Sequence, residues 1–462
     1  MEEVKQENEL GTENVGKLLF RLSLPAITAQ VINVLYNMVD RMYIGHIPKV
    51  GAAALTGVGV TMPVIMAITA FAYFISMGGA PRASIMLGKG KEETAEMILG
   101  NCTVMMAALS LLLTVIFQLT GRQILMMFGA SENTIGYAWD YMKIYSLGTI
   151  FVQLALGLNA FITAQGYAKT SMYTVLIGAV LNILLDPVFI FVLNMGVKGA
   201  ALATILSQAV SSVWVVRFLT SEKSRLRIRK RGLKLKGEII LPCMALGLSP
   251  FIMAFTESIL SVCFNSSLLK YGGDLAVGAM TILSSVMQFS MLPLQGLTQG
   301  AQPIVSFNYG AGSASRVKQV FRILLLGSVS YSTVLWGLAM FFPGLFIHIF
   351  TNDVQLASYT EWAIRIYMAA SLVFGAQVAC QQTFIALGNA KASVFLALLR
   401  KVFLLIPLIF LLPGFVRNQS MGVFLAEPIA DCIAVSVTVS LFLVSFKNVI
   451  RKMEENSYES NL

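Results

Sequence analysis

The chain has 462 residues, of which 56% are hydrophobic and 12% are charged, and its mean hydropathy is +0.75. Because soluble domains carry about 25% charged residues, this composition indicates an integral membrane protein. At about 20 residues per spanning helix, twelve spans would occupy most of the chain and leave no room for a soluble catalytic domain. We therefore expect a protein that is neither an enzyme nor a receptor with a folded head.

Residues 1–16 are polar and acidic and lack a basic stretch before a short apolar run, so we expect a cytosolic tail rather than a signal peptide. Apolar runs between polar or Gly/Pro breaks then predict an all-α membrane protein with twelve transmembrane helices. The predicted ranges are 17–45, 52–79, 96–120, 136–162, 169–193, 197–220, 239–269, 275–301, 318–342, 355–386, 391–413 and 421–446. Residues 447–462 form a second cytosolic tail.

Lysine and arginine are divided unevenly between the two sides of these helices. The termini and the even-numbered loops hold the run 223–236 and Lys5, Lys17, Arg21, Arg82, Lys89, Lys91, Lys169, Arg316, Lys318, Arg322, Lys391, Lys447, Arg451 and Lys452. The other side holds Arg41, Lys49, Arg122, Lys198, Lys270 and Arg417. The positive-inside rule therefore predicts a multi-pass protein of the cell membrane with both termini in the cytosol. It also favours contact of the basic run with anionic lipid headgroups over a nucleic-acid site.

The two halves of the chain repeat each other at an offset near 222 residues. The matching pairs include Gly78 and Gly300, Pro81 and Pro303, Ser84 and Ser306, Gly88 and Gly310, Gly90 and Gly312 and, with small insertions, Pro25 and Pro250. We therefore predict two six-helix lobes, 17–220 and 239–446, joined by a basic cytosolic linker at 221–238. Because six is an even number, the lobes should be related by a pseudo-twofold axis along the membrane normal. A central cleft between such lobes is a common plan for transporters.

Ionisable side chains inside a membrane span are costly and are therefore functional candidates. Counted at 1.5 Å per residue from the expected helix ends, Asp40, Thr204 and Asp186 lie about 7, 10 and 12 Å below the outer surface. Three different helices thus bring oxygen atoms to one depth. Asn182 precedes Asp186 by four residues and projects from the same helix face. Pro187 should bend the helix beside this carboxylate.

Carboxylates, an amide and a hydroxyl are ligands that suit a hard cation such as Na⁺. Two desolvated carboxylates that lie close together can also share a proton. The sequence therefore predicts a cation-coupling site, with H⁺ and Na⁺ both open. The alternatives are that Asp40 pairs with Arg41 at the headgroups and that Asp186 caps a kink. The five cysteines have no paired spacing, so we expect no cofactor and no other metal.

The second lobe lacks these acids, because the matching positions hold Asn265, Val402 and Ile406. It does have Glu257 in the middle of a span, with the amides Gln288 and Gln377 on other helices. We interpret these three as candidate cavity residues for a cationic substrate or a second proton, with a structural Glu257 as the alternative. Glu427 and Asp431 lie four residues apart near the start of the last helix, and we expect them to form ion pairs with Arg400 or Lys401.

The chain resembles the multidrug and toxic compound extrusion (MATE) family of secondary antiporters over essentially its whole length. The likeness rests on five segments: Tyr36-Asn-Met-Val-Asp40, Leu87-Gly-Lys-Gly-Lys-Glu-Glu-Thr-Ala95, Gln165-Gly-Tyr-Ala-Lys169, Asn182-Ile-Leu-Leu-Asp186-Pro187 and Gly196-Val-Lys-Gly-Ala-Ala-Leu-Ala-Thr204. It implies a cation site at Asp40, Asn182, Asp186 and Thr204, with Tyr36, Tyr141 and Asn159 beside it. Glu257 resembles the helix-seven glutamate of another branch. That branch also has an acid on helix ten, where this chain has glutamines.

We therefore expect an antiporter that exports amphipathic, often cationic, small molecules in exchange for H⁺ or Na⁺ by alternating access, as a monomer among membrane lipids. The resemblance also implies a role in antibiotic resistance. The alternative is a flippase for a lipid-linked glycan precursor, which would need several mid-membrane cations for pyrophosphate. A major-facilitator carrier is less favoured, because residues 79–90 lack an Asp-Arg-x-Gly-Arg pattern. A membrane enzyme is disfavoured by the presence of only two histidines, both near expected helix ends.

Overall fold

The computed structural model describes residues 9–459, and within these residues every regular element is a helix. Residues 1–8, which include Lys5 of the expected tail, and residues 460–462 lie outside the described part. The α-helices are α2 (Val15–Gly45), α3 (Gly51–Gly88), α4 (Glu92–Met127), α5 (Ile135–Leu147), α6 (Thr149–Ala164), α7 (Ala168–Pro187), α8 (Val197–Thr220), α9 (Gly237–Gly310), α10 (Ala314–Phe341), α11 (Gly344–Ile347), α12 (Val354–Tyr367), α13 (Ser371–Ala386), α14 (Ala390–Leu398), α15 (Ile406–Leu411) and α16 (Gln419–Glu459). There are also two π-helical segments, η1 (Val188–Val192) and η3 (Leu399–Leu405), and two 3-10 segments, η2 (Lys230–Leu233) and η4 (Leu412–Gly414).

Helix α9 contains two spans rather than one. Gly273 interrupts its 74 residues with a backbone φ of 66°, a region that glycine adopts readily. A straight helix would hold Cys243 and Gly310 about 100 Å apart. Both residues instead pack against the same part of α3, Cys243 against Gly78 and Gly310 against Ile85. The chain therefore turns back at Gly273, as the predicted ranges 239–269 and 275–301 require.

Two further spans are bent pairs of helices. Helices α5 and α6 meet at 59°, and helices α12 and α13 meet at 49°. The first bend lies at Gly148, whose missing side chain lets Ile205 of α8 approach the backbone. Within the described residues nine single helices can cross a membrane, the bent pairs raise this number to eleven, and the turn in α9 raises it to twelve. The predicted count of twelve spans is confirmed.

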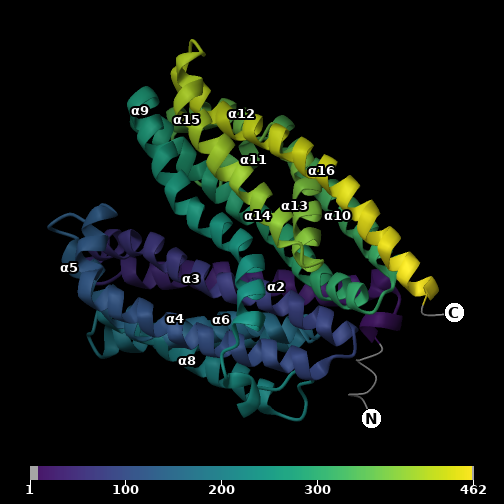
Figure 1. Ribbon diagram of the computed structural model, residues 1–462. Coiled ribbons are helices and arrows are strands. Elements are labelled where there is room, and N and C mark those ends of the chain that lie inside the picture. Colours follow the sequence, from purple (N-terminus) through teal and green to yellow (C-terminus); the bar gives the residue numbers. More distant parts are fainter. Residues whose placement is uncertain (1–8, 460–462) are drawn as a thin grey trace.

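The spans form two lobes, α2–α8 and α9–α16, which lie together near the two termini and diverge toward the end that carries α5 (Figure 1). The buried apolar clusters show the same division. One cluster near the termini includes Leu87 and Leu99 of the first lobe together with Val305 and Val317 of the second. At the opposite end each lobe has a cluster of its own. The two lobes therefore share one apolar core at the end near the termini and have separate apolar cores at the opposite end.

Repeat-related glycines form the contact between the lobes. A Cβ added at Gly88 would overlap the carbonyl oxygen of Phe307, and a Cβ added at Gly310 would overlap the carbonyl oxygen of Ile85. Gly310 is the repeat equivalent of Gly88, and Phe307 is the repeat equivalent of Ile85, each at an offset of 222 residues. The two contacts are therefore equivalent. This reciprocity is what a pseudo-twofold axis between two parallel repeats produces. Only glycine allows the two backbones to approach so closely.

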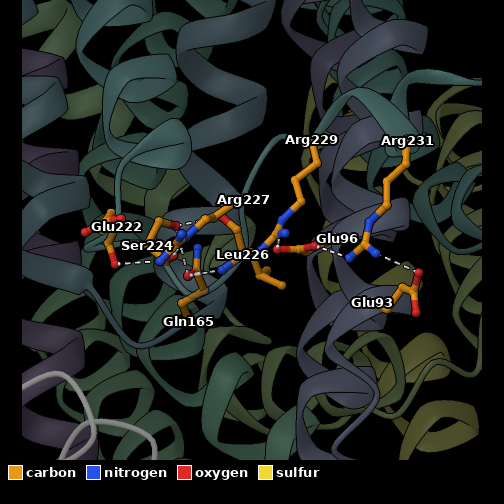
Figure 2. Close-up of polar contacts among 9 residues, drawn as sticks. All are labelled: Glu93, Glu96, Gln165, Glu222, Ser224, Leu226, Arg227, Arg229 and Arg231. Atoms are coloured by element: carbon orange, nitrogen blue, oxygen red, sulfur yellow. Dashed lines mark hydrogen bonds and ion pairs between the residues drawn. The ribbon is translucent and has the colours of Figure 1, made fainter.

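The basic linker lies along the beginning of α4 (Figure 2). Glu96, only 6% exposed, accepts from Arg229 at 3.0 Å and from Arg231 at 2.8 Å. On the other side of the linker, the side-chain oxygen of Gln165 accepts from the Ser224 hydroxyl at 3.2 Å and from the backbone N–H of Leu226 at 2.9 Å. These contacts hold the linker against the first lobe.

Several arginines of this basic run pair with acids of the same chain, and its contact with lipid headgroups stays a prediction. Arg231 also pairs with Glu93 at 2.8 Å, and Arg225 pairs with Glu92 at 2.8 Å. The acids belong to the first turn of α4, where the helix dipole favours negative charge. Charge counting along the chain could not show that Glu92, Glu93 and Glu96 pair with three arginines of the run, because these acids precede them by more than 130 residues.

Candidate functional site: two polar clusters in equivalent helices

Asp40 and Asp186 meet inside the first lobe, where α2 packs against α7. Their side chains are nearly inaccessible, with exposures of 6% and 0%, and their carboxyl groups lie within hydrogen-bonding reach of each other. Two carboxylates in contact, shielded from water, cannot both remain charged without a proton or a cation to neutralise them. No ion pair joins Asp40 to Arg41 within the described residues, where the Arg41 side chain instead contacts the sulfur of Met62 at 3.3 Å.

Asn182 and Thr204 complete this acid cluster. The Asn182 amide nitrogen donates to Oδ1 of Asp186 at 3.2 Å, and the same nitrogen lies 3.4 Å from the Thr204 hydroxyl. The contact with Asp186 is the predicted i, i+4 pair on α7, and Thr204 comes from α8. The structure therefore brings together the four residues that the sequence places at one depth.

Three oxygen atoms of the acid cluster have no hydrogen-bond partner among the described residues: Oδ1 of Asp40, Oδ1 of Asn182 and Oδ2 of Asp186. Buried polar atoms normally have partners, so three orphaned acceptors in one place mark a site for a ligand that offers positive charge or a proton. The described residues contain no group of three or more His, Cys, Asp or Glu side chains that could hold a metal ion. The donors here are oxygens, which suit a hard cation and not a soft one.

Two tyrosines border the acid cluster. Tyr141 is 3% exposed, stacks on Tyr145 with ring centroids 6.0 Å apart and lies near the Thr204 side chain. Tyr36 precedes Asp40 by one turn of α2, so the two side chains project from the same face of the helix. Asn159 lies elsewhere, because its amide donates to the carbonyl of Ser171 at 3.2 Å. Ser171 is about 16 Å from Asn182 along α7, so Asn159 is not a neighbour of the acids.

Pro187 explains the local geometry of α7. Proline has no backbone N–H and its ring clashes with the carbonyl four residues earlier. The α-helix accordingly ends at Pro187 and continues as the π-helical η1, which begins two residues after Asp186. Such π-helical turns are rare and occur frequently at functional sites. The equivalent span of the second lobe also has one, η3, which holds Arg400 and Lys401 before Pro407.

The second lobe contains a cluster of five charged side chains, hereafter the charged cluster: Glu257, Arg400, Lys401, Glu427 and Asp431. Arg400 pairs with Asp431 at 2.6 Å and with Glu427 at 3.2 Å, as expected, and stacks over the ring of Phe374. Lys401 turns instead to Glu257, at 2.6 Å. Glu257 is therefore not a free carboxylate, which the sequence alone had left open.

Exposure separates Glu257 from the rest of the charged cluster. Its side chain is 58% exposed, although it lies in the middle of a span, whereas the Lys401 side chain is 6% exposed. Gln377 is buried and donates to Gln381, which in turn contacts Met253 one turn before Glu257. Gln288 is exposed and has no hydrogen bond within the described residues. The structure thus connects Gln377 to the surroundings of Glu257 and leaves Gln288 apart.

The two clusters use equivalent helices. The acid cluster takes its residues from spans one, five and six, and the charged cluster takes its residues from spans seven, eleven and twelve. In the first lobe the acids have no basic partner among the described residues, whereas in the second lobe Arg400 and Lys401 pair with the three acids. The contact between Lys401 and Glu257 joins residues 144 positions apart, so pattern and spacing offered no signal for it.

The match to a protein family shows the same two halves as the internal repeat. A sequence model of the MatE family matches the chain twice, over residues 25–188 and 250–411. The two matches begin at Pro25 and Pro250, which the internal comparison also aligns. Among curated proteins, the multidrug export protein MepA of Staphylococcus haemolyticus is 23% identical over 93% of this chain and 94% of its own length. MepA of Staphylococcus aureus strain N315 is 24% identical over 86% and 87%.

Solved structures share the fold. A ligand-bound structure of the MATE multidrug transporter DinF-BH is 34% identical to this chain, with a TM-score of 0.87, over 95% of this chain and 98% of that one. A crystal structure of MATE in the bent conformation is 20% identical, with a TM-score of 0.90, over 97% of this chain and 99% of that one.

Proposed function

Because this chain belongs to the MatE family of efflux transporters, we propose that it is an antiporter that exports amphipathic, often cationic, small molecules in exchange for H⁺ or Na⁺. One observation carries the coupling half of this proposal. Two buried carboxyl groups from different helices lie in contact, with unpartnered oxygens beside them. A proton or a sodium ion between these groups cancels one of their two negative charges and removes the repulsion, and its release restores two repelling charges that favour another arrangement of the helices.

Alternating access follows from the way the lobes are joined. In this structure they share a core near the termini and separate toward the end with α5. Cation binding at Asp40 and Asp186 pulls α2 toward α7, and the contacts of α2 with the second lobe, such as Ser23 with Gly300, transmit the change. After the substrate is released at the open end, the cation binds in its place and drives the lobes back to the other conformation.

The names of the relatives support a drug-like cargo, since MepA is named as a multidrug export protein. The charges do not favour the flippase alternative. Arg400 and Lys401, the basic residues of the mid-span charged cluster, are both held by carboxylates, so neither is free for a pyrophosphate. Glu257 is paired as well, with Lys401 at 2.6 Å, but its side chain is 58% exposed, so a cationic substrate can approach its carboxylate from the open side.

Transport in everted membrane vesicles tests this proposal. A cationic fluorescent dye should be accumulated when either a pH gradient or a sodium gradient is imposed, and the effective gradient identifies the coupling ion. Vesicles with the Asp40→Asn variant serve as the control for leakage. Accumulation that needs ATP, or that occurs with neither gradient, would show that the protein is not a secondary antiporter.

We also propose that both termini and the linker lie in the cytosol, on the basis of the lysine and arginine count. Lys230 is exposed and has no ion pair within the described residues, so a cysteine there would be accessible from its own side of the membrane. In a Cys432→Ser background, which removes the exposed native thiol, Lys230→Cys should resist a membrane-impermeant thiol reagent in intact cells. Asn133→Cys, in the exposed loop after α4, should react. The reverse pattern would invert the orientation.

A further inference from the structure

A cavity of about 560 Å³ lies between the lobes at the end that carries the termini. Lys89, in the turn after α3, lines it from the first lobe. Tyr309 and Gly312, around the turn between α9 and α10, and Lys452 and Asn456, on α16, line it from the second lobe. Neither the acid cluster nor the charged cluster contributes a residue, so this cavity is separate from the proposed transport machinery.

The cavity is positively charged. Lys89 and Lys452 have no carboxylate partner among the described residues. Of the acids on this part of α16 whose side chains are described, Glu454 pairs with Lys318 at 2.6 Å and Glu455 pairs with Arg451 at 3.5 Å. Two ammonium groups that line one cavity from opposite lobes, with neighbouring carboxylates engaged elsewhere, favour an anionic occupant.

A smaller, partly apolar cavity adjoins the charged one. Its volume is about 230 Å³, and it shares Tyr309 and Val449 with the larger cavity. The rest of its lining combines the apolar Phe384, Leu387 and Phe446 with the polar Asn389 and Ser445, all from the second lobe. An occupant that fills both spaces can place a negative group near the lysines and a hydrocarbon chain against the apolar side chains.

The position along α16 matches the headgroup layer of a bilayer. Val449 follows Gln419, the first residue of α16, by thirty residues, which correspond to about 45 Å. The hydrocarbon core is about 30 Å thick, and about 40–45 Å with the headgroups. This length places the charged cavity near the headgroup layer opposite to the one where α16 begins, with the partly apolar cavity beside it.

We propose that the two cavities together bind one anionic phospholipid, with its phosphate near Lys89 and Lys452 and part of an acyl chain against Phe446 and Leu387. Because Lys89 and Lys452 belong to different lobes, the lipid bridges the lobes beside the contact of Gly88 with Phe307. The bound lipid stabilises the conformation described here, in which the two lobes lie together near the termini. When the lobes separate there, the phosphate loses its contact with one of the two lysines.

Thermal unfolding of the purified full-length protein in neutral detergent tests this site. Phosphatidylglycerol should raise the unfolding midpoint more than phosphatidylcholine does, and the Lys89→Gln/Lys452→Gln variant should lose most of that difference. Lys447→Gln removes an exposed lysine of α16 that lines neither cavity, and it should keep the difference. An equal loss in both variants would show a non-specific charge effect, and full retention in the double variant would also overturn the proposal.

A second arm distinguishes a lipid from a soluble anion. Inorganic phosphate and glycerol phosphate, which lack acyl chains, should leave the midpoint nearly unchanged at concentrations where phosphatidylglycerol acts. If either reproduces the whole shift, the site binds a free phosphate and the lipid assignment is wrong. The unfolding midpoint in phosphatidylcholine alone reports whether the double variant folds. Mass spectrometry of the intact protein should show about tenfold less bound phosphatidylglycerol in that variant. This corresponds to a loss of about 1.4 kcal/mol of binding free energy.

Discussion

Asp40→Asn is expected to abolish coupled export while the protein still inserts and folds. Asparagine keeps the shape of the side chain but removes the charge that a proton or a sodium ion neutralises. One cation entering down 100 mV supplies about 2.3 kcal/mol, and each tenfold concentration gradient supplies about 1.4 kcal/mol. Without this drive the steady-state substrate gradient should fall by roughly a few hundredfold. Dye accumulation in everted vesicles at matched expression measures the loss.

Glu257→Gln is the matched comparison, because it makes the same isosteric change in the second lobe. It leaves the acid cluster intact and removes only the partner of Lys401. We expect a smaller loss, confined to cationic substrates that use the exposed carboxylate. If Asp40→Asn exports normally and Glu257→Gln is inactive, the coupling site belongs to the second lobe, and the proposal for Asp40 and Asp186 has to be abandoned.

Arg400→Met is expected to cause the largest loss of stability. The Arg400, Asp431 and Glu427 side chains are each 7% exposed, and the guanidinium group is the partner of both acids. Removing one member of a buried ion pair leaves an uncompensated charge and lowers the free energy of unfolding by about 3–5 kcal/mol. The unfolding midpoint in detergent should fall accordingly, and adding Asp431→Asn to the variant should recover part of the loss.

Arg365→Met provides the control for Arg400→Met. Arg365 pairs with Glu361 at 3.0 Å in an i, i+4 arrangement, and the two side chains are 44% and 51% exposed. Water and salt screen such a pair, so its loss should change stability by about 0.5 kcal/mol or less. Equal midpoints for the two variants would mean that the charged cluster is hydrated and contributes no more than a surface pair.

The membrane setting made much of the fold predictable. Spanning helices must satisfy their own backbone hydrogen bonds and match the bilayer thickness, so twelve spans could be counted from apolar runs. Their ends were less predictable. The predicted helix 52–79 extends to Gly88, and the predicted helix 96–120 begins at Glu92 and ends at Met127. These extensions are polar or lie outside the hydrocarbon, where hydropathy carries no signal.

The acid cluster was also predictable as a set, because helix geometry converts sequence position into depth. Asp40, Asp186 and Thr204 fall at one level by residue counting, and Asn182 follows from the i, i+4 spacing. Resemblance alone placed Asn159 beside the acids. Asn159 lies at a different depth, because its amide contacts Ser171 near the other end of α7.

The amino-acid sequence by itself determined the number of spans, the two-lobe repeat and the residues of the acid cluster, since these depend on periodicity and on distance along one helix. Only the tertiary structure decided which distant charges meet. Lys401 turns to Glu257 while its neighbour Arg400 turns to Asp431, and Glu96 takes the linker arginines. Such contacts join residues more than 30 positions apart. They depend on how helices rotate and pack, which no local pattern encodes.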